Sequence, residues 1–97
     1  MRIISRKALK DYWEKEPTTE QELKAWFAEA KNAGWQTPAE VKAKYGNASI
    51  LKDGRVVFNI RGNNYRLITK INYDFQIIYI RFIGTHKEYD KINAQTV

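Results

Sequence analysis

Three apolar runs between Arg55 and Ile92 constrain the fold of this chain more than any other feature. Two short polar breaks, Gly62-Asn63-Asn64 and Tyr73-Asp74-Phe75, separate these runs. Runs of this length, alternating or continuous in apolar residues and bounded by turn residues, predict strands. Because strands joined by such short turns run antiparallel, we expect a meander.

The residues before the meander carry the apolar spacing of amphipathic helices. In the first of them, Leu9, Tyr12 and Trp13 share one face. Helices are predicted at residues 6–16, from the capping threonines 18 and 19 to about 33, and from 38 to 45. The pair Ile3-Ile4 is long enough for an edge strand. The sequence therefore predicts one α+β domain over residues 1–97: an antiparallel, twisted sheet of three to four strands plus an N-terminal edge strand, two to three helices packed on one face, and a short C-terminal helix.

Basic side chains follow the meander. A formal net charge of +6 favours a polyanionic partner such as nucleic acid. Between residues 54 and 81, five basic side chains stand against one acid, and the five are Arg55, Arg61, Arg66, Lys70 and Arg81. The period of two along a strand places Arg66 and Lys70 on one face of the sheet. We expect the apolar face to pack on the helices and the basic face to remain as a platform.

The same alternation predicts the two faces of the last strand. Ile78, Ile80 and Phe82 are expected on one face. The opposite face would then carry Tyr79, Arg81 and Ile83.

Composition excludes several classes of protein. Cysteine is absent and histidine occurs once, which excludes a disulfide scaffold, a Cys-ligated zinc or iron–sulfur site, and a two-histidine metal site within one chain. We therefore expect neither a metal nor a cofactor. No signal peptide and no apolar run of about 18 residues is evident, so we expect a cytoplasmic protein without a membrane partner.

A capping box, Thr85-His86-Lys87-Glu88, follows the last predicted strand and predicts that a short helix begins at His86. The N-terminus of a helix offers free N–H groups and a partial positive charge, which suit a phosphate. Tyr89 and Asp90 follow His86 at i+3 and i+4 and therefore lie on its face of the helix. In that arrangement Tyr89 can donate to an oxygen held beside His86, and Asp90 can orient the imidazole.

Three stretches of the chain resemble the HigB branch of the RelE/ParE toxin superfamily. They are Asn59-x-x-Gly62-Asn63-x-x-Arg66, followed by Ile80-Arg81-x-x-x-Thr85-His86-Lys87-Glu88-Tyr89-Asp90, and the opening Ile3-Ile4-Ser5-Arg6-Lys7-Ala8-Leu9-Lys10-Asp11. The resemblance implies a RelE-like fold and a toxin of a type II toxin–antitoxin pair. It further implies a metal-independent endoribonuclease that cleaves messenger RNA, usually in the ribosomal A site. The implied partner is a HigA-like helix-turn-helix antitoxin, in a hetero-oligomer with the toxin.

Superfamily active sites carry arginines and lysines on the concave face of the sheet, with a Tyr or His near the C-terminus. The catalytic candidates are His86, Arg66, Arg81 and Tyr89. The candidates for holding RNA are Lys70, Lys87, Asn63, Arg55 and Arg61. We expect Arg66 and Arg81 to place guanidinium groups on one phosphate. His86 is the expected general base, with the acid role left open.

Two other functions fit the same composition. One is a non-catalytic, ParE-like toxin that poisons a protein such as gyrase, and the other is a plain nucleic-acid-binding module. Both need the arginines but neither needs a base. The pairing of His86 with Tyr89 beside two arginines therefore favours the nuclease.

Overall fold

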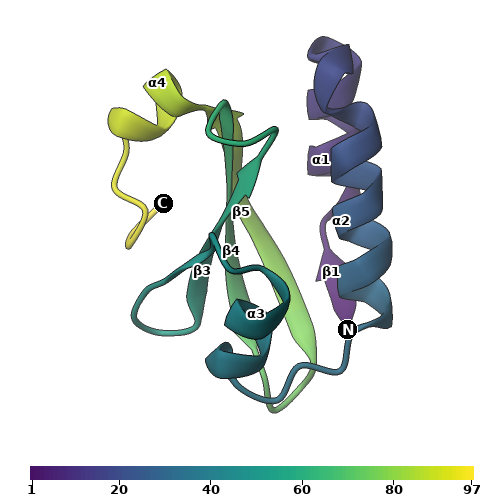
Figure 1. Ribbon diagram of the computed structural model, residues 1–97, viewed down its shortest axis with the longest axis vertical. Coiled ribbons are helices and arrows are strands. Elements are labelled where there is room, and N and C mark those ends of the chain that lie inside the picture. The colour runs from purple at the N-terminus through teal and green to yellow at the C-terminus, as the bar shows by residue number, and fades with distance from the viewer.

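The computed structural model describes residues 1–97 and confirms the α+β fold (Figure 1). The strands are β1 (Arg2–Ile4), β2 (Ser49–Ile50), β3 (Arg55–Ile60), β4 (Tyr65–Asn72) and β5 (Ile77–Thr85). The helices are α1 (Arg6–Lys15), α2 (Glu20–Asn32), α3 (Pro38–Lys44) and α4 (His86–Asp90), with one 3₁₀ turn at Pro17–Thr19. None of the helices is long and apolar enough to cross a membrane.

All five strands form one sheet in the order β1-β5-β4-β3-β2. The strands β2 to β5 pair antiparallel, as the turn signals predict, and the N-terminal strand β1 pairs parallel to β5 at the edge. At the start of α3 the Thr37 hydroxyl accepts from the Glu40 N–H, as expected of a capping threonine. The Thr19 side chain does not cap α2 as predicted, because its hydroxyl donates to the Glu16 carbonyl at 2.8 Å within the 3₁₀ turn.

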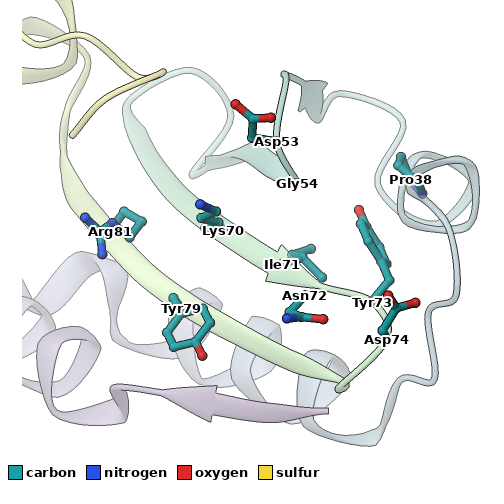
Figure 2. Close-up of a pocket in the computed structure, with 10 residues that line it drawn as sticks. All are labelled: Pro38, Asp53, Gly54, Lys70, Ile71, Asn72, Tyr73, Asp74, Tyr79 and Arg81. Carbon is teal, nitrogen blue, oxygen red and sulfur yellow. The ribbon is translucent and has the colours of Figure 1, made fainter.

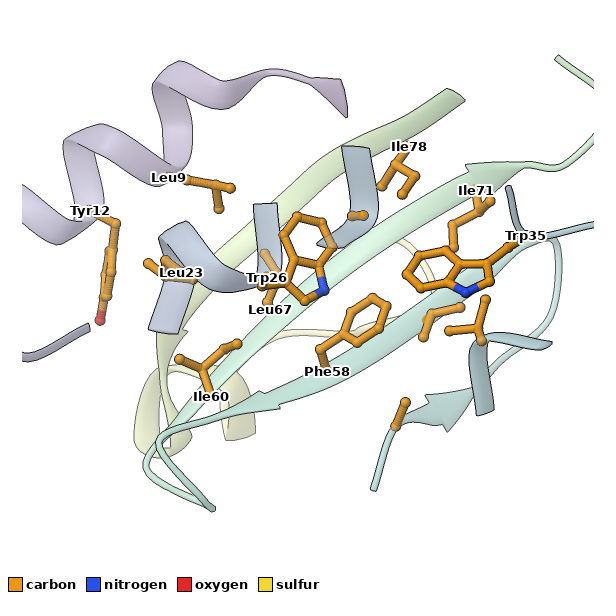
Figure 3. Close-up of a cluster of buried hydrophobic side chains, with 14 of the residues drawn as sticks. Leu9, Tyr12, Leu23, Trp26, Trp35, Phe58, Ile60, Leu67, Ile71 and Ile78 are labelled. Carbon is orange, nitrogen blue, oxygen red and sulfur yellow. The ribbon is translucent and has the colours of Figure 1, made fainter. Parts of the chain in front are cut away.

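One face of the sheet, here called the core face, packs on the helices. Figure 3 shows its side chains interleaved with those of α1 and α2. The Trp26 ring of α2 packs edge-to-face with the Phe58 ring, with the ring centres 5.3 Å apart, and the Tyr45 ring makes a second edge-to-face contact with Phe58 at 5.2 Å. Phe58 itself is 1% exposed. Each large apolar side chain buried in this way stabilises the fold by roughly 1.5–3 kcal/mol, which makes this face the main source of stability.

A β-bulge interrupts the pairing of β4 with β5. Ile68 pairs with Phe82 and Thr69 pairs with Ile80, so Arg81 is the extra residue. Residues that pair directly across two strands share a face of the sheet. Phe82 therefore lies with Ile68, on the face away from the helices.

The bulge corrects the predicted alternation of the last strand. Ile83 pairs with the buried core residue Leu67 and packs against the core, whereas the sequence pattern had placed Phe82 there. Strict alternation fails because the extra residue moves every later side chain to the opposite face.

The second face of the sheet, here called the site face, is partly covered by α4 and residues 91–97 (Figure 1). Val57 and Ile68 are 2% and 0% exposed but lie outside the core cluster. The Arg55 guanidinium donates to the carbonyl oxygens of Ala94 at 3.0 Å and Val97 at 2.6 Å. The expected open platform is therefore occupied at its centre by the C-terminal segment.

Candidate active site

The helix α4 is held at the end of β5 by the predicted capping box. The Thr85 hydroxyl accepts from the Glu88 N–H at 3.1 Å, and a Glu88 carboxylate oxygen accepts from the Thr85 N–H at 2.8 Å. These hydrogen bonds, led by the one from the Thr85 N–H, lower the pKa of the Glu88 carboxyl below its ordinary value. The His86 N–H donates to the Asn64 carbonyl at 3.0 Å, which joins α4 to the turn between β3 and β4.

Gly84 makes room for this arrangement. It lies opposite Arg66 on the site face. A Cβ at this position would stand 2.6 Å from Cζ of Phe82 and 3.0 Å from a Glu88 carboxylate oxygen. A side chain here would therefore displace either the Phe82 ring or the capping carboxylate.

His86 is oriented by a carboxylate one helical turn away. Its Nδ1 lies 3.0 Å from an Asp90 carboxylate oxygen, the contact expected from the i, i+4 spacing. When Nδ1 carries the proton and donates to Asp90, Nε2 keeps a lone pair and can accept a proton. Both side chains are about half exposed, so the imidazole is fixed and still open to a substrate.

Tyr89 connects this histidine to Arg66. Its ring meets the His86 ring edge-on with the centres 6.5 Å apart. The Arg66 Cζ atom lies 5.6 Å from the centre of the Tyr89 ring, a cation–π contact. One terminal nitrogen of Arg66 donates to the carbonyls of Asn63 at 3.0 Å and Tyr65 at 3.3 Å. The remaining guanidinium N–H groups are left for a phosphate.

Lys70 and Arg81 belong to a second group farther along the site face. Lys70 pairs with Tyr79 on β5. On β4 it lies four residues after Arg66, which separates the two backbone positions by roughly 13 Å. The Nε of Arg81 donates to the Val97 carbonyl at 3.2 Å. Gly84 is the residue opposite Arg66, and Arg81 lies three residues before it on β5. The expected binding of one phosphate by both Arg66 and Arg81 therefore stays a prediction.

The other residues expected to hold RNA lie at different depths. Arg55 is only 7% exposed and its guanidinium is bonded to the C-terminal segment. Arg61 is exposed in the turn after β3, beside the start of α2, where its backbone N–H donates to the Glu22 carboxylate. Lys87 is exposed on α4 next to His86. RNA binding by these three residues stays a prediction.

A pocket of about 650 Å³ at the hairpin end of the site face was not predicted from the sequence (Figure 2). Its polar lining includes Asp53, Lys70, Asn72, Asp74, Tyr79 and Arg81. The alternation of Tyr79 and Arg81 on β5 is the one sequence signal that indicated an aromatic side chain beside the basic ones. No group of three or more His, Asp or Glu side chains that could hold a metal ion occurs in the structure.

Comparison with known proteins shows which family has a similar sequence. Residues 19–92 match a family described as HigB_toxin, the RelE-like toxic component of a toxin–antitoxin system. The mRNA interferase toxin HigB of Escherichia coli strain K12 is 36% identical over 96 residues, which cover 97% of this chain and 92% of that protein. The mRNA interferase HigB of Escherichia coli O6:H1 is 29% identical over 94 residues, covering 95% of this chain and 91% of that protein.

Proposed function

This chain belongs to the HigB family of RelE-like toxins of toxin–antitoxin systems, and from that premise we propose that it is an endoribonuclease that cleaves messenger RNA. The contact chain that runs from Asp90 through His86 and Tyr89 to Arg66 supports this proposal. It places a proton acceptor, a phenolic hydroxyl and a guanidinium group side by side. A plain RNA-binding surface would need the guanidinium alone.

In the proposed reaction the 2′-hydroxyl of the RNA attacks the adjacent phosphate. The bond from O2′ to phosphorus forms, the bond from phosphorus to O5′ breaks, and Nε2 of His86 takes the proton of the 2′-hydroxyl. The products are a 2′,3′-cyclic phosphate and a 5′-hydroxyl end. Tyr89 donates a hydrogen bond to a phosphoryl oxygen or to the departing 5′-oxygen, and that oxygen takes its proton from the Tyr89 hydroxyl or from water. No metal takes part in this route.

Arg66 neutralises the charge that grows on the phosphoryl oxygens in the transition state. Its contacts with Asn63 and the Tyr89 ring fix the guanidinium before the substrate arrives. Groups held in place in this way lose little energy to reorganisation, and for that reason they stabilise a transition state more than the ground state. The exposed Lys87 beside His86 would hold a neighbouring phosphate.

The proposed setting is the cytoplasm, with messenger RNA presented in the ribosomal A site as the substrate. The proposed partner in the resting cell is a HigA-like helix-turn-helix antitoxin that forms a hetero-oligomer with this chain. With a net charge of +6, the toxin favours an antitoxin that presents acidic groups to the site face. Hydrogen exchange in the complex should then be slowed within residues 55–92.

Controlled expression followed by mapping of messenger RNA ends tests the nuclease. Growth arrest should be accompanied by new 5′ ends that carry a hydroxyl group, and purified ribosomes with toxin should give the same ends. The His86→Ala variant, expressed to the same level, should leave messages intact. Arrest with intact messages and failing DNA supercoiling would replace the nuclease with a gyrase poison.

A further inference from the structure

We propose that the pocket at the hairpin end of the site face binds one nucleotide of the RNA, stacks its base on Tyr79, and favours bases that carry an exocyclic amino group. The inference rests on the proposed function only for the identity of the ligand as RNA. It adds a determinant of sequence preference to the same face of the sheet.

The pocket collects polar side chains from four parts of the chain (Figure 2). Lys70 comes from β4, and Tyr79 and Arg81 come from β5. Asp53 is contributed by the hairpin turn before β3, and Asp74 by the turn between β4 and β5. Because the walls are rigid strands and tight turns, the pocket exists without a ligand.

The charged groups of the pocket have no ion-pair partners within the chain. All the ion pairs of the protein lie elsewhere, and none includes Lys70, Arg81, Asp53 or Asp74. The Arg81 guanidinium donates one N–H to the Val97 carbonyl, so four of its five N–H donors remain available to a ligand. Two unpaired cations and two unpaired carboxylates around one pocket indicate a ligand that carries both a negative group and hydrogen-bond donors.

The balance of these charges distinguishes a nucleotide from a bare anion. Two cations and two carboxylates line the pocket, so its formal charge is zero in a chain whose net charge is +6. An isolated phosphate would be drawn to the lysine and arginine but repelled by Asp53 and Asp74. A nucleotide brings a phosphate for the cations and N–H donors for the carboxylates.

Tyr79 and Asn72 supply the groups that would contact a base. The Tyr79 ring is half-buried beside Lys70, makes no hydrogen bond through its hydroxyl, and offers a face for stacking. The Asn72 side-chain oxygen accepts from the Phe75 N–H at 3.0 Å, so the amide NH₂ group remains a donor. Carboxylates accept from base amino groups, as Asp does from N4 of cytosine. Uracil has no such amino group and should bind most weakly.

Position along the sheet makes this site distinct from the cleavage site. Lys70 lies four residues from Arg66 on the same face of β4, or roughly 13 Å. At that spacing the two side chains are placed to hold different phosphates of an extended RNA strand. The pocket would therefore take a nucleotide some steps away from the bond that is cleaved, and bind it whether or not cleavage occurs.

The test is a titration of the intact, isotope-labelled protein with the 5′-monophosphates of adenosine, cytidine, guanosine and uridine, and with inorganic phosphate, followed by amide NMR. We expect shifts at residues 70–81, with uridine monophosphate and phosphate binding most weakly. Tyr79→Ala should weaken binding of the preferred nucleotide about 5- to 100-fold, the loss expected for one base–aromatic stack. Tyr79→Phe should bind as the wild type does, and Lys70→Gln should weaken all of the nucleotides. Lys10→Gln, an exposed lysine on α1, is the matched control and should change nothing.

Equal binding of all five probes would overturn the inference, because the pocket would then recognise only an anion. Absence of shifts at residues 70–81 would overturn it as well, even if the chain cleaves messenger RNA. Nucleotide binding in a protein that leaves messages intact would support the pocket and contradict the nuclease. The two proposals can therefore fail separately.

Discussion

The two faces of the sheet use the same strands for different purposes. On the core face most side chains of the central strands are large, apolar and buried, and two helices of 10 and 13 residues pack on them. The site face is covered only by a five-residue helix and the segment that follows it, and its candidate side chains stay exposed or half-exposed, apart from Arg55 beneath the C-terminal segment. The difference teaches that stability and chemistry are carried by opposite sides of one sheet. Substitutions should therefore affect one property and spare the other.

The largest expected effect is the loss of activity in His86→Ala. If His86 moves a proton in the transition state, the cleavage rate should fall roughly 10²- to 10⁴-fold. The free energy of unfolding should change by less than about 1 kcal/mol, because the side chain is exposed and its backbone N–H still donates to Asn64. Single-turnover cleavage and denaturant unfolding measure the two quantities. A variant with full activity would transfer the chemistry to Tyr89 and Arg66.

The converse experiment is Phe58→Ala on the core face. Removing this buried ring, which contacts both Trp26 and Tyr45, should lower the free energy of unfolding by about 3–5 kcal/mol. Phe75→Ala is the matched control, since that ring is 76% exposed and its loss should cost less than about 0.5 kcal/mol. Urea unfolding measures both variants. The comparison between the faces fails if folded Phe58→Ala protein cleaves RNA much more slowly than the wild type.

Gly54→Ala should be intermediate in its cost. Gly54 has φ of +77°, and a Cβ there would overlap the Ile71 carbonyl oxygen of the neighbouring strand. Left-handed backbone strain and the clash together should cost roughly 2–4 kcal/mol in unfolding free energy. Gly34→Ala is the control, because no atom lies within 4 Å of the added methyl group. Thermal unfolding of the two variants should differ clearly, and equal midpoints would contradict the geometry of this turn.

Arg66→Ala should have a smaller effect than these variants, and it should act on the affinity for RNA. One lost phosphate contact should weaken association with RNA or the ribosome and flatten the slope of log affinity against log salt by about one unit. The Tyr89 ring would lose its cation, but the core face would be untouched. A salt slope equal to that of the wild type would mean that Arg66 only supports the turn at Asn63.

Local sequence signals predicted most of this architecture. The three strands of the meander and the capping box at residues 85–88 follow from side-chain spacing within a few residues, and so does the contact of His86 with Asp90. The bulge at Arg81 was missed because β5 is apolar on both faces, so its alternation carries little information about register.

Long-range contacts account for the rest of what the sequence did not predict. The bonds from Arg55 to Ala94 and Val97 join residues about 40 positions apart, and no local pattern indicates them. Asp53 likewise lines the same pocket as Lys70 and Tyr79 only because the sheet brings these distant parts of the sequence together. The spacing of side chains within one element therefore predicts the structure of α4 better than the surface around it.

The smallest expected effect is a local response of α4 to acid. The bond from the Thr85 N–H, followed by those with its hydroxyl and the charges of Lys15 and Lys91, lowers the pKa of Glu88 in the folded protein. The folded state therefore binds fewer protons at Glu88 than the unfolded state does. Its contribution to stability is complete above the ordinary glutamate pKa and is lost as the pH falls through the lowered folded value.

Because Glu88 is exposed, we expect the cap of α4 to loosen while the core face stays folded. An NMR titration from about pH 6 to about pH 3 should move the Thr85 amide at a lower pH than an ordinary glutamate would, and leave the Trp26 indole signal in place. In Glu88→Gln the Thr85 amide should lose that response, because the amide side chain keeps an acceptor but cannot titrate. Simultaneous movement of the Thr85 and Trp26 signals would show that the two faces unfold as one unit.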